Sequence, residues 1–286
     1  FRNYQFRGDS LLLQPWRREG SAEESRAYHL LEITGREASR PLAAAERREL
    51  RQSVEEEHLG RRRFPLGTDK FGRCFLSRLI IGARISLAVG LIAVLISLSI
   101  GLLLGALAGY YGGRTDDAIL LLINTVWSIP TLLLVFAIVL ALGRHPWNVY
   151  AAVGLTMWVD VARLVRGQVM EVRTQPFVEA GRSMGFRSGR ILLRHILPNI
   201  VGPLLVVTAA NFAMAILIEA GLSYLGFGIQ PPQPSWGNML NENYGFALSG
   251  KPFLALIPAL AIMLLVLAFN LLGNGLRDVM DVKRSR

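Results

Sequence analysis

Long apolar runs alternate with short charged stretches from about residue 86 to the end of the chain. A membrane-crossing helix needs about 20 largely apolar residues to cover about 30 Å of hydrocarbon. Five runs have that length, and the third is the least apolar because Asp160 and Arg163 lie inside its predicted cytoplasmic half. We therefore expect five membrane spans, at Ser86–Ala108, Ala118–Leu142, Trp147–Val165, Ile200–Ala220 and Phe253–Leu272.

Two patterns inside these spans concern helix packing. Ser97, Gly101, Gly105 and Gly109 recur every four residues, so they share one helix face on which another helix can approach closely. Pro130 lies near the centre of the second span, where it removes a backbone hydrogen bond and bends the helix. We expect a packing face in the first span and a kink in the second, which is either structural or part of a transport path.

Polar residues inside the spans are candidates for a transport pathway, because lipid offers them no hydrogen-bond partners. Glu219 near the end of the fourth span would either contact an amine on the cargo or satisfy nearby backbone and arginine groups. Asn270 is a further intramembrane polar residue. The candidate pathway residues are Asn124, Pro130, Asn211 and Glu219.

The charge distribution distinguishes a membrane protein from a nucleic-acid-binding one. The 286 residues carry 31 Lys and Arg against 21 Asp and Glu, a net charge of +10, yet 52% are hydrophobic. Many arginines flank spans on one side of the expected bilayer, whereas the opposite connections carry chiefly Arg144 and Lys251. Since Lys and Arg in short loops mark the cytoplasmic face, we expect the middle loop and the C-terminus inside and residues 1–78 outside.

Residue types needed for covalent or metal chemistry are scarce. Cys74 is the only cysteine, and the four histidines are scattered without metal-ligand spacing. The chain also lacks the Gly-x-x-x-x-Gly-Lys-Ser/Thr loop that cradles nucleotide phosphates. We expect no catalytic site, no metal and no bound cofactor in this chain.

Residues 1–63 differ from the rest because they are largely polar. Ala43–His58 combines strong helix formers with opposite charges three and four residues apart, which predicts a solvated helix. The polar segment is either the connection after a first span that precedes Phe1 or a soluble tail on a five-span protein. We expect four regions: extracytoplasmic 1–63, interfacial 64–85, transmembrane 86–275 and a cytoplasmic tail at 276–286.

The interfacial segment begins with a turn motif. Gly67 and Gly72 permit a tight turn in which Asp69 can hydrogen-bond to backbone amides. Phe75, Leu79 and Ile80 follow at helical spacing. Arg73, Arg78 and Arg84 are expected to form a polar flank at the membrane surface, so an anchoring role is favoured over a substrate site.

The middle charged loop, residues 171–199, has its own helical pattern. The expected structure is a helix-turn-helix: Phe177, Ala180 and Met184 on one face of the first helix, a turn at Gly185, and a second helix from Ile191 closed by Pro198. Arginines surround the turn, while Phe177, Met184 and Phe186 offer anchors for a partner's groove. The pattern alone fits docking on a protein and binding to the membrane surface equally well.

Several motifs, in order along residues 64–286, resemble one family. Glu179-Ala180-Gly181, Gly185 and Leu197-Pro198 resemble the cytoplasmic EAA loop of permease subunits in binding-protein-dependent ABC importers. Gly181 replaces the usual second alanine, at a cost below about 1 kcal/mol in helix propensity, and His195 replaces a common isoleucine. The stretches 66–86, 219–240 and 269–278 are similar to the C-type permease of dipeptide, oligopeptide and nickel importers.

The resemblance implies an all-α, polytopic type I ABC importer transmembrane domain in a bacterial inner membrane. It implies a second permease subunit, two ABC ATPase subunits that carry ATP and Mg, and an extracytoplasmic binding protein. Peptides are the expected cargo, with nickel, glutathione or a peptide antibiotic as alternatives and an ion-coupled carrier as a more distant one. The implied ATPase-coupling residues are Phe177, Glu179, Ala180, Gly181, Met184, Gly185, Phe186, Arg187, Leu197 and Pro198.

Overall fold

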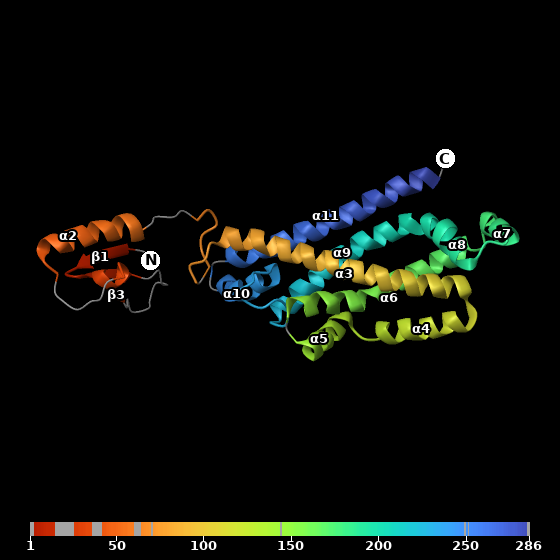
Figure 1. The fold of residues 1–286 in the computed structure, drawn as a ribbon, viewed down its shortest axis with the longest axis horizontal. Helices are drawn as coiled ribbons and strands as arrows, with labels where there is room; N and C mark the ends of the chain where they lie inside the picture. Colours follow the sequence, from red (N-terminus) through yellow and green to blue (C-terminus); the bar gives the residue numbers. More distant parts are fainter. Residues whose placement is uncertain are drawn as a thin grey trace. The chain divides into compact units, whose positions relative to one another are not determined.

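A computed structural model of the chain describes residues 3–14, 26–35, 42–59, 64–69, 71–143, 145–248, 250 and 252–284, without the side chains of 248 and 281–284. The chain divides into two compact units, Phe1–Arg63 and Phe64–Arg286, which are treated separately (Figure 1). Arg144 and Lys251, expected in the outer connections, lie outside the described residues.

The N-terminal unit contains a small antiparallel sheet that the polar composition did not predict. Its strands pair in the order β1-β2-β3, with Phe6 opposite Leu11. The helix expected over 43–58 is confirmed, but the expectation that it is wholly solvated is wrong, because Leu50 and Val54 are buried against Leu11. The elements are β1 Asn3–Arg7, β2 Ser10–Gln14, β3 Arg26–His29, α1 Leu30–Ile33, α2 Ala44–Ser53 and the π-helix η1 Val54–His58.

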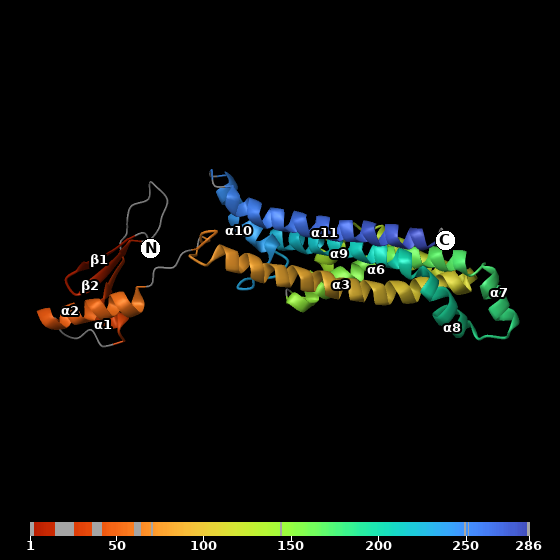
Figure 2. The same ribbon diagram turned by 90° about the horizontal axis from the view of Figure 1, so that it is seen from above.

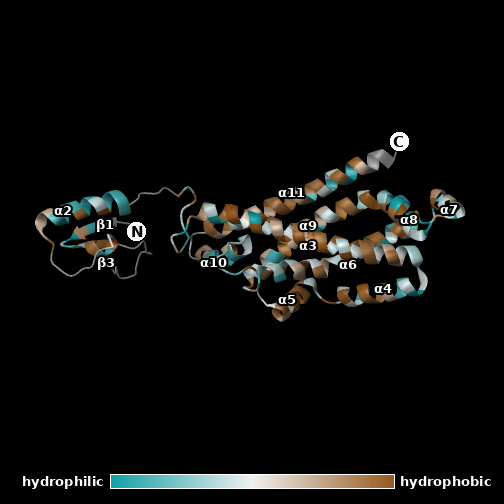
Figure 3. Ribbon diagram, in the orientation of Figure 1, coloured by the Kyte–Doolittle hydropathy of each residue, from teal (hydrophilic) through white to brown (hydrophobic). Residues whose placement is uncertain are grey.

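The second unit is helical, and its long helices lie side by side (Figure 2). Apolar residues cover most of α3, α5, α9 and α11 (Figure 3). Helices α7 and α8 lie at one end of this unit and α10 at the other (Figure 1). The elements are α3 Phe75–Tyr111, α4 Gly113–Trp127, α5 Thr131–Leu142, α6 Pro146–Val172, α7 Pro176–Ser183, α8 Ser188–Ile191, π-helix η2 Leu192–Ile196, 3₁₀-helix η3 Leu197–Ile200, α9 Val201–Tyr224, α10 Trp236–Leu248 and α11 Phe253–Arg284.

Four of the five expected spans coincide with helices that are long and apolar enough to cross a membrane. Among the described residues three helices qualify singly, and α4 with α5 makes a fourth if that pair is one span. The pair is bent by 89° at the predicted Pro130 break. The third expected span, Trp147–Val165, coincides with the 27-residue helix α6, which is not among the qualifying helices. A count of five spans therefore stays a prediction.

The small-residue face of α3 packs directly on α6, as predicted. A Cβ atom added to Gly101, Gly105 or Gly109 would lie only 2.5–2.6 Å from atoms of α6. For Gly105 and Gly109 the nearest atoms are the backbone carbonyl oxygens of Ala162 and Arg166. The two helices thus touch backbone to backbone, an approach that only residues without a side chain permit. This contact holds α6 in place beside the longest helix of the unit.

Candidate functional site

The loop between α6 and α9 folds as a helix followed by a glycine turn. Helix α7 begins with Pro176 in its first turn, where the missing N–H costs nothing. It ends in a Schellman motif: the Phe186 amide donates to the Gly181 carbonyl (3.1 Å) and the Gly185 amide donates to the Arg182 carbonyl (2.9 Å). Gly185 has φ of +78°, which a glycine adopts without strain. The predicted helix and its turn at Gly185 are confirmed.

The second half of the loop corrects the prediction that Pro198 closes a helix. Pro198 lies in the first turn of η3, and the helical path runs on from Ser188 to Tyr224. A proline is tolerated there because the preceding π turn has already displaced the hydrogen-bond pattern. The Asn199 side chain donates to the His195 carbonyl at 2.6 Å, so that carbonyl keeps a partner. The loop therefore continues into α9 without a break.

Buried contacts hold the loop against the ends of the long helices. Val178 and Ile191 are buried in a cluster with Val165 and Val169 of α6. Phe186 stacks on His195, with ring centroids 5.8 Å apart. Within α7 the buried residues are Val178 and Gly181, so this side of the helix faces the rest of the unit.

Arg173 joins the loop to the C-terminus of α3. Its guanidinium donates to the carbonyls of Gly109 (2.9 Å) and Tyr110 (3.2 Å), which lie in the last turn of that helix and lack intrahelical partners. A cation there also interacts favourably with the negative end of the helix dipole. The loop is thus attached to α3 as well as to α9.

The outer surface of the loop is apolar with a basic rim. Phe177 is 44% exposed, Met184 65% and Leu193 68%. Of the ten expected coupling residues, Gly181 is buried, and Phe186 and Leu197 are half-buried. The others are exposed: Phe177, Glu179, Ala180, Met184, Gly185, Arg187 and Pro198.

The four candidate pathway residues do not converge on one point. Asn124 and Pro130 belong to the bent pair, and the Asn124 side-chain oxygen accepts a hydrogen bond from Arg163 (3.4 Å). Asn211 is buried inside the bundle. Glu219 is fully buried and accepts a 2.6 Å hydrogen bond from the Ser223 hydroxyl.

A cavity of about 250 Å³ opens beside the break between α4 and α5. Its polar lining includes Asp160 and Thr156, one turn apart on α6, and the aromatic ring of Trp127. Asp160 was expected near the cytoplasmic edge of a span; it lies near the middle of α6, which runs from Pro146 to Val172, and its depth in the membrane stays a prediction. Thr156 and Trp127 were missed, since nothing in their sequence context separates them from ordinary core residues.

Comparison with known proteins agrees with this architecture. Residues 101–286 match the family described as "Binding-protein-dependent transport system inner membrane component". The chain belongs to this family. It is thus a multi-pass permease component of the inner membrane.

Curated relatives of the permease are similar to it over about three quarters of the chain. A glutathione transport system permease protein of Pectobacterium atrosepticum is 44% identical over 218 residues, covering 76% of this chain and 72% of the relative. A dipeptide transport system permease protein of Alkalihalophilus pseudofirmus is 42% identical over 217 residues, 76% of this chain and 71% of the relative. An oligopeptide transport system permease protein of Bacillus subtilis is 38% identical over the same shares of the two chains.

Solved structures show the same fold. An inward-facing form of the MetNI methionine ABC transporter matches with a TM-score of 0.54 at 20% identity, covering 70% of this permease and 97% of that chain. An amino acid ABC transporter crystallised with histidines gives 0.52 at 16% identity, covering 71% and 94%. At these identities the likeness concerns the fold alone, the transmembrane fold of type I ABC importers.

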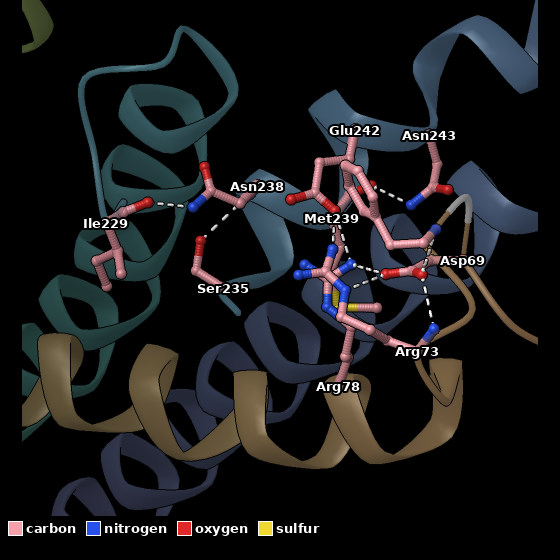
Figure 4. Close-up of polar contacts among 10 residues, drawn as sticks. Asp69, Arg73, Arg78, Ile229, Ser235, Asn238, Met239, Glu242 and Asn243 are labelled. Carbon is pink, nitrogen blue, oxygen red and sulfur yellow. Dashed lines mark hydrogen bonds and ion pairs between the residues drawn. The ribbon is translucent and has the colours of Figure 1, made fainter. Parts of the chain in front are cut away.

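At the other end of the permease unit, a buried ion-pair cluster joins α3 to α10 (Figure 4). The Asp69 carboxylate accepts hydrogen bonds from the amides of Phe71 and Arg73 (both 2.9 Å), which confirms the predicted turn. Arg78 donates to Asp69 (2.7 Å) and to Glu242 of α10 (2.6 Å). The expectation that Arg78 lies on an exposed polar flank is wrong, because it is 7% exposed. Its two carboxylate partners account for its burial.

Asp69 remains ionised well below neutral pH in this cluster. Burial alone would raise its pKa, but hydrogen bonds from the amide and guanidinium of Arg73 and from the Phe71 amide outweigh that effect. The pKa of Asp69 therefore lies below its usual value. Nearby, the indole N–H of Trp236 donates to the Leu79 carbonyl (2.9 Å), and Asn238 donates to the Ile229 carbonyl. Helix α10 is thereby fixed to the start of α3.

Proposed function

We propose that this permease forms half of the translocation pathway of an ATP-driven importer of di- or oligopeptides, and that an ATPase subunit docks on its 171–199 loop. Its partners are a second homologous permease subunit, two ABC ATPase subunits and an extracytoplasmic substrate-binding protein. ATP and Mg are bound and ATP is hydrolysed on the ATPase subunits, so this chain is not itself an enzyme. The loop and the C-terminus face the cytoplasm, and residues 1–78 lie outside.

One observation carries the docking proposal. The loop exposes Phe177 and Met184 beside a rim of arginines, although its own backbone is fixed by buried contacts and by Arg173. A rigid, exposed apolar patch with a charged rim is typical of a protein interface. A loop that bound only the membrane surface would not need the hydrogen bonds that Arg173 donates to the C-terminal carbonyls of α3. The names of the curated relatives, which are permeases of dipeptide, oligopeptide and glutathione systems, support the choice of cargo.

Glutathione is the second candidate cargo, because its named permeases reach 44–46% identity to this chain. It is itself a small peptide, so the same pathway chemistry would serve it. Membership in a binding-protein-dependent family favours the ATP-driven importer over an ion-coupled carrier. Nickel and peptide antibiotics are not named among the relatives described above and remain alternatives.

The test uses the complete transporter in proteoliposomes, with uptake of labelled dipeptide, tripeptide and glutathione measured with and without ATP. The double variant Phe177→Ala with Met184→Ala should insert normally but lose ATPase subunits on co-purification and lose uptake. Leu121→Ala on α4 is the matched control, because Leu121 is also a large apolar side chain and is 71% exposed. This variant should retain ATPase association and uptake. Full ATPase association in the double variant would reject the docking site. Uptake that does not depend on ATP would reject the importer assignment. Failure to take up the dipeptide, the tripeptide and glutathione would also reject it.

The charge of the loop is tested by Glu179→Arg together with Gly185→Asp. The first change reverses a charge in the first turn of α7, and the second places a side chain where φ is +78°. We expect transport to be uncoupled while the subunit stays inserted. Unchanged uptake by this double variant would also reject the docking role.

A further inference from the structure

The cavity beside the α4–α5 break contains a carboxylate without a partner. Asp160 makes no hydrogen bond or ion pair with any residue that the structure describes, and its electrostatic neighbour is Arg163. The Arg163 guanidinium is itself engaged, because it lies 3.8 Å from the centre of the Trp127 ring and donates to Asn124. An ionisable residue inside a membrane span is costly and usually faces a cavity that serves transport. Asp160 lies within the third expected span and lines this cavity.

The rest of the cavity limits what it can hold. About 250 Å³ corresponds to about eight water molecules at about 30 Å³ each. Apart from Asp160, Thr156 and Thr131, the lining is mainly apolar and includes Ile218 and Met214 of α9. The Trp127 ring, which the Arg163 guanidinium already contacts at 3.8 Å, adds aromatic area to the lining. A small group with one positive charge and an apolar portion matches this lining.

We infer that Asp160, with Thr156 and Trp127, binds the terminal ammonium of a peptide cargo during its passage, while the apolar walls receive the first side chain. The inference rests on the proposed function, since it names the part of the cargo that this subunit contacts. The carboxylate accepts from the ammonium N–H groups, and Trp127 lies beside the charge. The bent α4–α5 pair supplies one wall, so the Pro130 break shapes the site without contacting the ammonium.

The first test compares uptake of one labelled dipeptide, delivered by the same loaded binding protein, in reconstituted transporters. Asp160→Asn keeps the size of the side chain but removes its charge, and uptake should fall about tenfold or more, as expected for loss of a hydrogen bond to a charged group. Asp160→Glu should retain most of the uptake. ATP hydrolysis stimulated by the loaded binding protein should stay within about twofold of wild type in both. Asp117→Asn removes an exposed carboxylate from α4 and serves as the matched control, with no expected effect.

The outcomes separate the two proposals. If wild type shows no ATP-dependent peptide uptake, the proposed function fails. If wild type transports and Asp160→Asn transports equally well, only the ammonium site is rejected. A parallel loss of uptake and stimulated ATP hydrolysis would also reject it, because the carboxylate would then serve assembly or coupling.

A second test needs no substitution. A dipeptide with a photoreactive diazirine in its first residue is trapped in the wild-type transporter during turnover and irradiated. After digestion of the transporter, we expect the cross-linked fragments of this chain to contain Met214 or Ile218. An excess of unlabelled dipeptide should prevent the cross-linking. Labelling confined to other segments of this chain would overturn the site even if Asp160→Asn failed to assemble.

Discussion

Replacing Arg78 by methionine should destabilise the permease more than replacing Arg73, the other arginine of the ion-pair cluster. The Arg78 side chain is 8% exposed and contacts Asp69 at 2.7 Å and Glu242 at 2.6 Å. Asp69 is 1% and Glu242 15% exposed. Methionine fills a similar volume but removes the positive charge that pairs with both carboxylates. Removing one partner of a buried ion pair typically costs about 3–5 kcal/mol.

Arg73 provides an internal comparison, because it contacts the same two carboxylates with a side chain that is 36% exposed. Solvent screens such a pair, so Arg73→Met should cost about 1 kcal/mol or less. For a unit of this size about 1 kcal/mol shifts Tm by about 2–4 °C. Arg78→Met should therefore lower the Tm of the purified permease by on the order of 10 °C, and Arg73→Met by only about 3 °C.

The assay is thermal unfolding of the detergent-solubilised complex, followed by intrinsic fluorescence. Adding Asp69→Asn and Glu242→Gln to Arg78→Met should recover part of the loss, since the stranded charges are removed. Equal Tm values for the Arg78→Met and Arg73→Met variants would refute the reasoning. So would a triple variant less stable than Arg78→Met alone, because the loss would then come from packing and not from unpaired charge.

Three further changes test other parts of the permease. Gly105→Ala should destabilise the permease by about 1–3 kcal/mol, because the new Cβ would lie 2.5 Å from the Ala162 carbonyl oxygen across the α3–α6 contact. Gly167→Ala has open space around it and is the control in the same unfolding assay. Gly181→Ala should leave uptake intact and stabilise α7 by up to about 1 kcal/mol, since its Cβ would make ordinary contact with Phe186 at 3.4 Å; lost uptake would contradict this. Because the folded pKa of Asp69 is lowered, its contribution to stability is present above the unfolded value near 3.8 and is lost as pH falls through the folded pKa. The Tm difference between wild type and Asp69→Asn should shrink below about pH 4, and a difference independent of pH would exclude that linkage.

Features set by local pattern were predictable from the sequence. The apolar runs predicted the long helices, the four-residue spacing of small residues predicted a packing face on α3 but not its partner α6, and Gly185 predicted the loop turn. Pro130 correctly marked the break but gave no indication of its 89° angle, which depends on how α5 packs on α6 and α9. The N-terminal sheet was missed because its strands are only four or five residues long and partly polar.

Features that depend on distant partners were not predictable. Arg78 was expected in solvent because arginine near a membrane surface usually is; its burial requires Glu242, 164 residues away in the chain. The end of α6 was also misjudged, because the apolar run ends near Val165 whereas the helix continues to Val172 in contact with α3. The cavity itself combines four helical segments, and no local pattern encodes such a space.

The uninterrupted path through Pro198 bears on how docking at the loop would reach the cargo. The loop joins α6 and α9, and these helices also wall the cavity, through Thr156 and Asp160 on one side and Met214 and Ile218 on the other. A helical path of 37 residues from Ser188 to Tyr224 spans about 55 Å at about 1.5 Å per residue. Had Pro198 ended a separate helix, displacement of α7 and α8 would have been absorbed at that joint. Since α9 continues from the loop, and Arg173 fixes α6 to the end of α3, a displacement of the loop by an ATPase would change the separation of the cavity walls. The π turn at Leu192–Ile196 is then the place where the hydrogen-bond pattern can adjust without interrupting the helical path from the loop into α9.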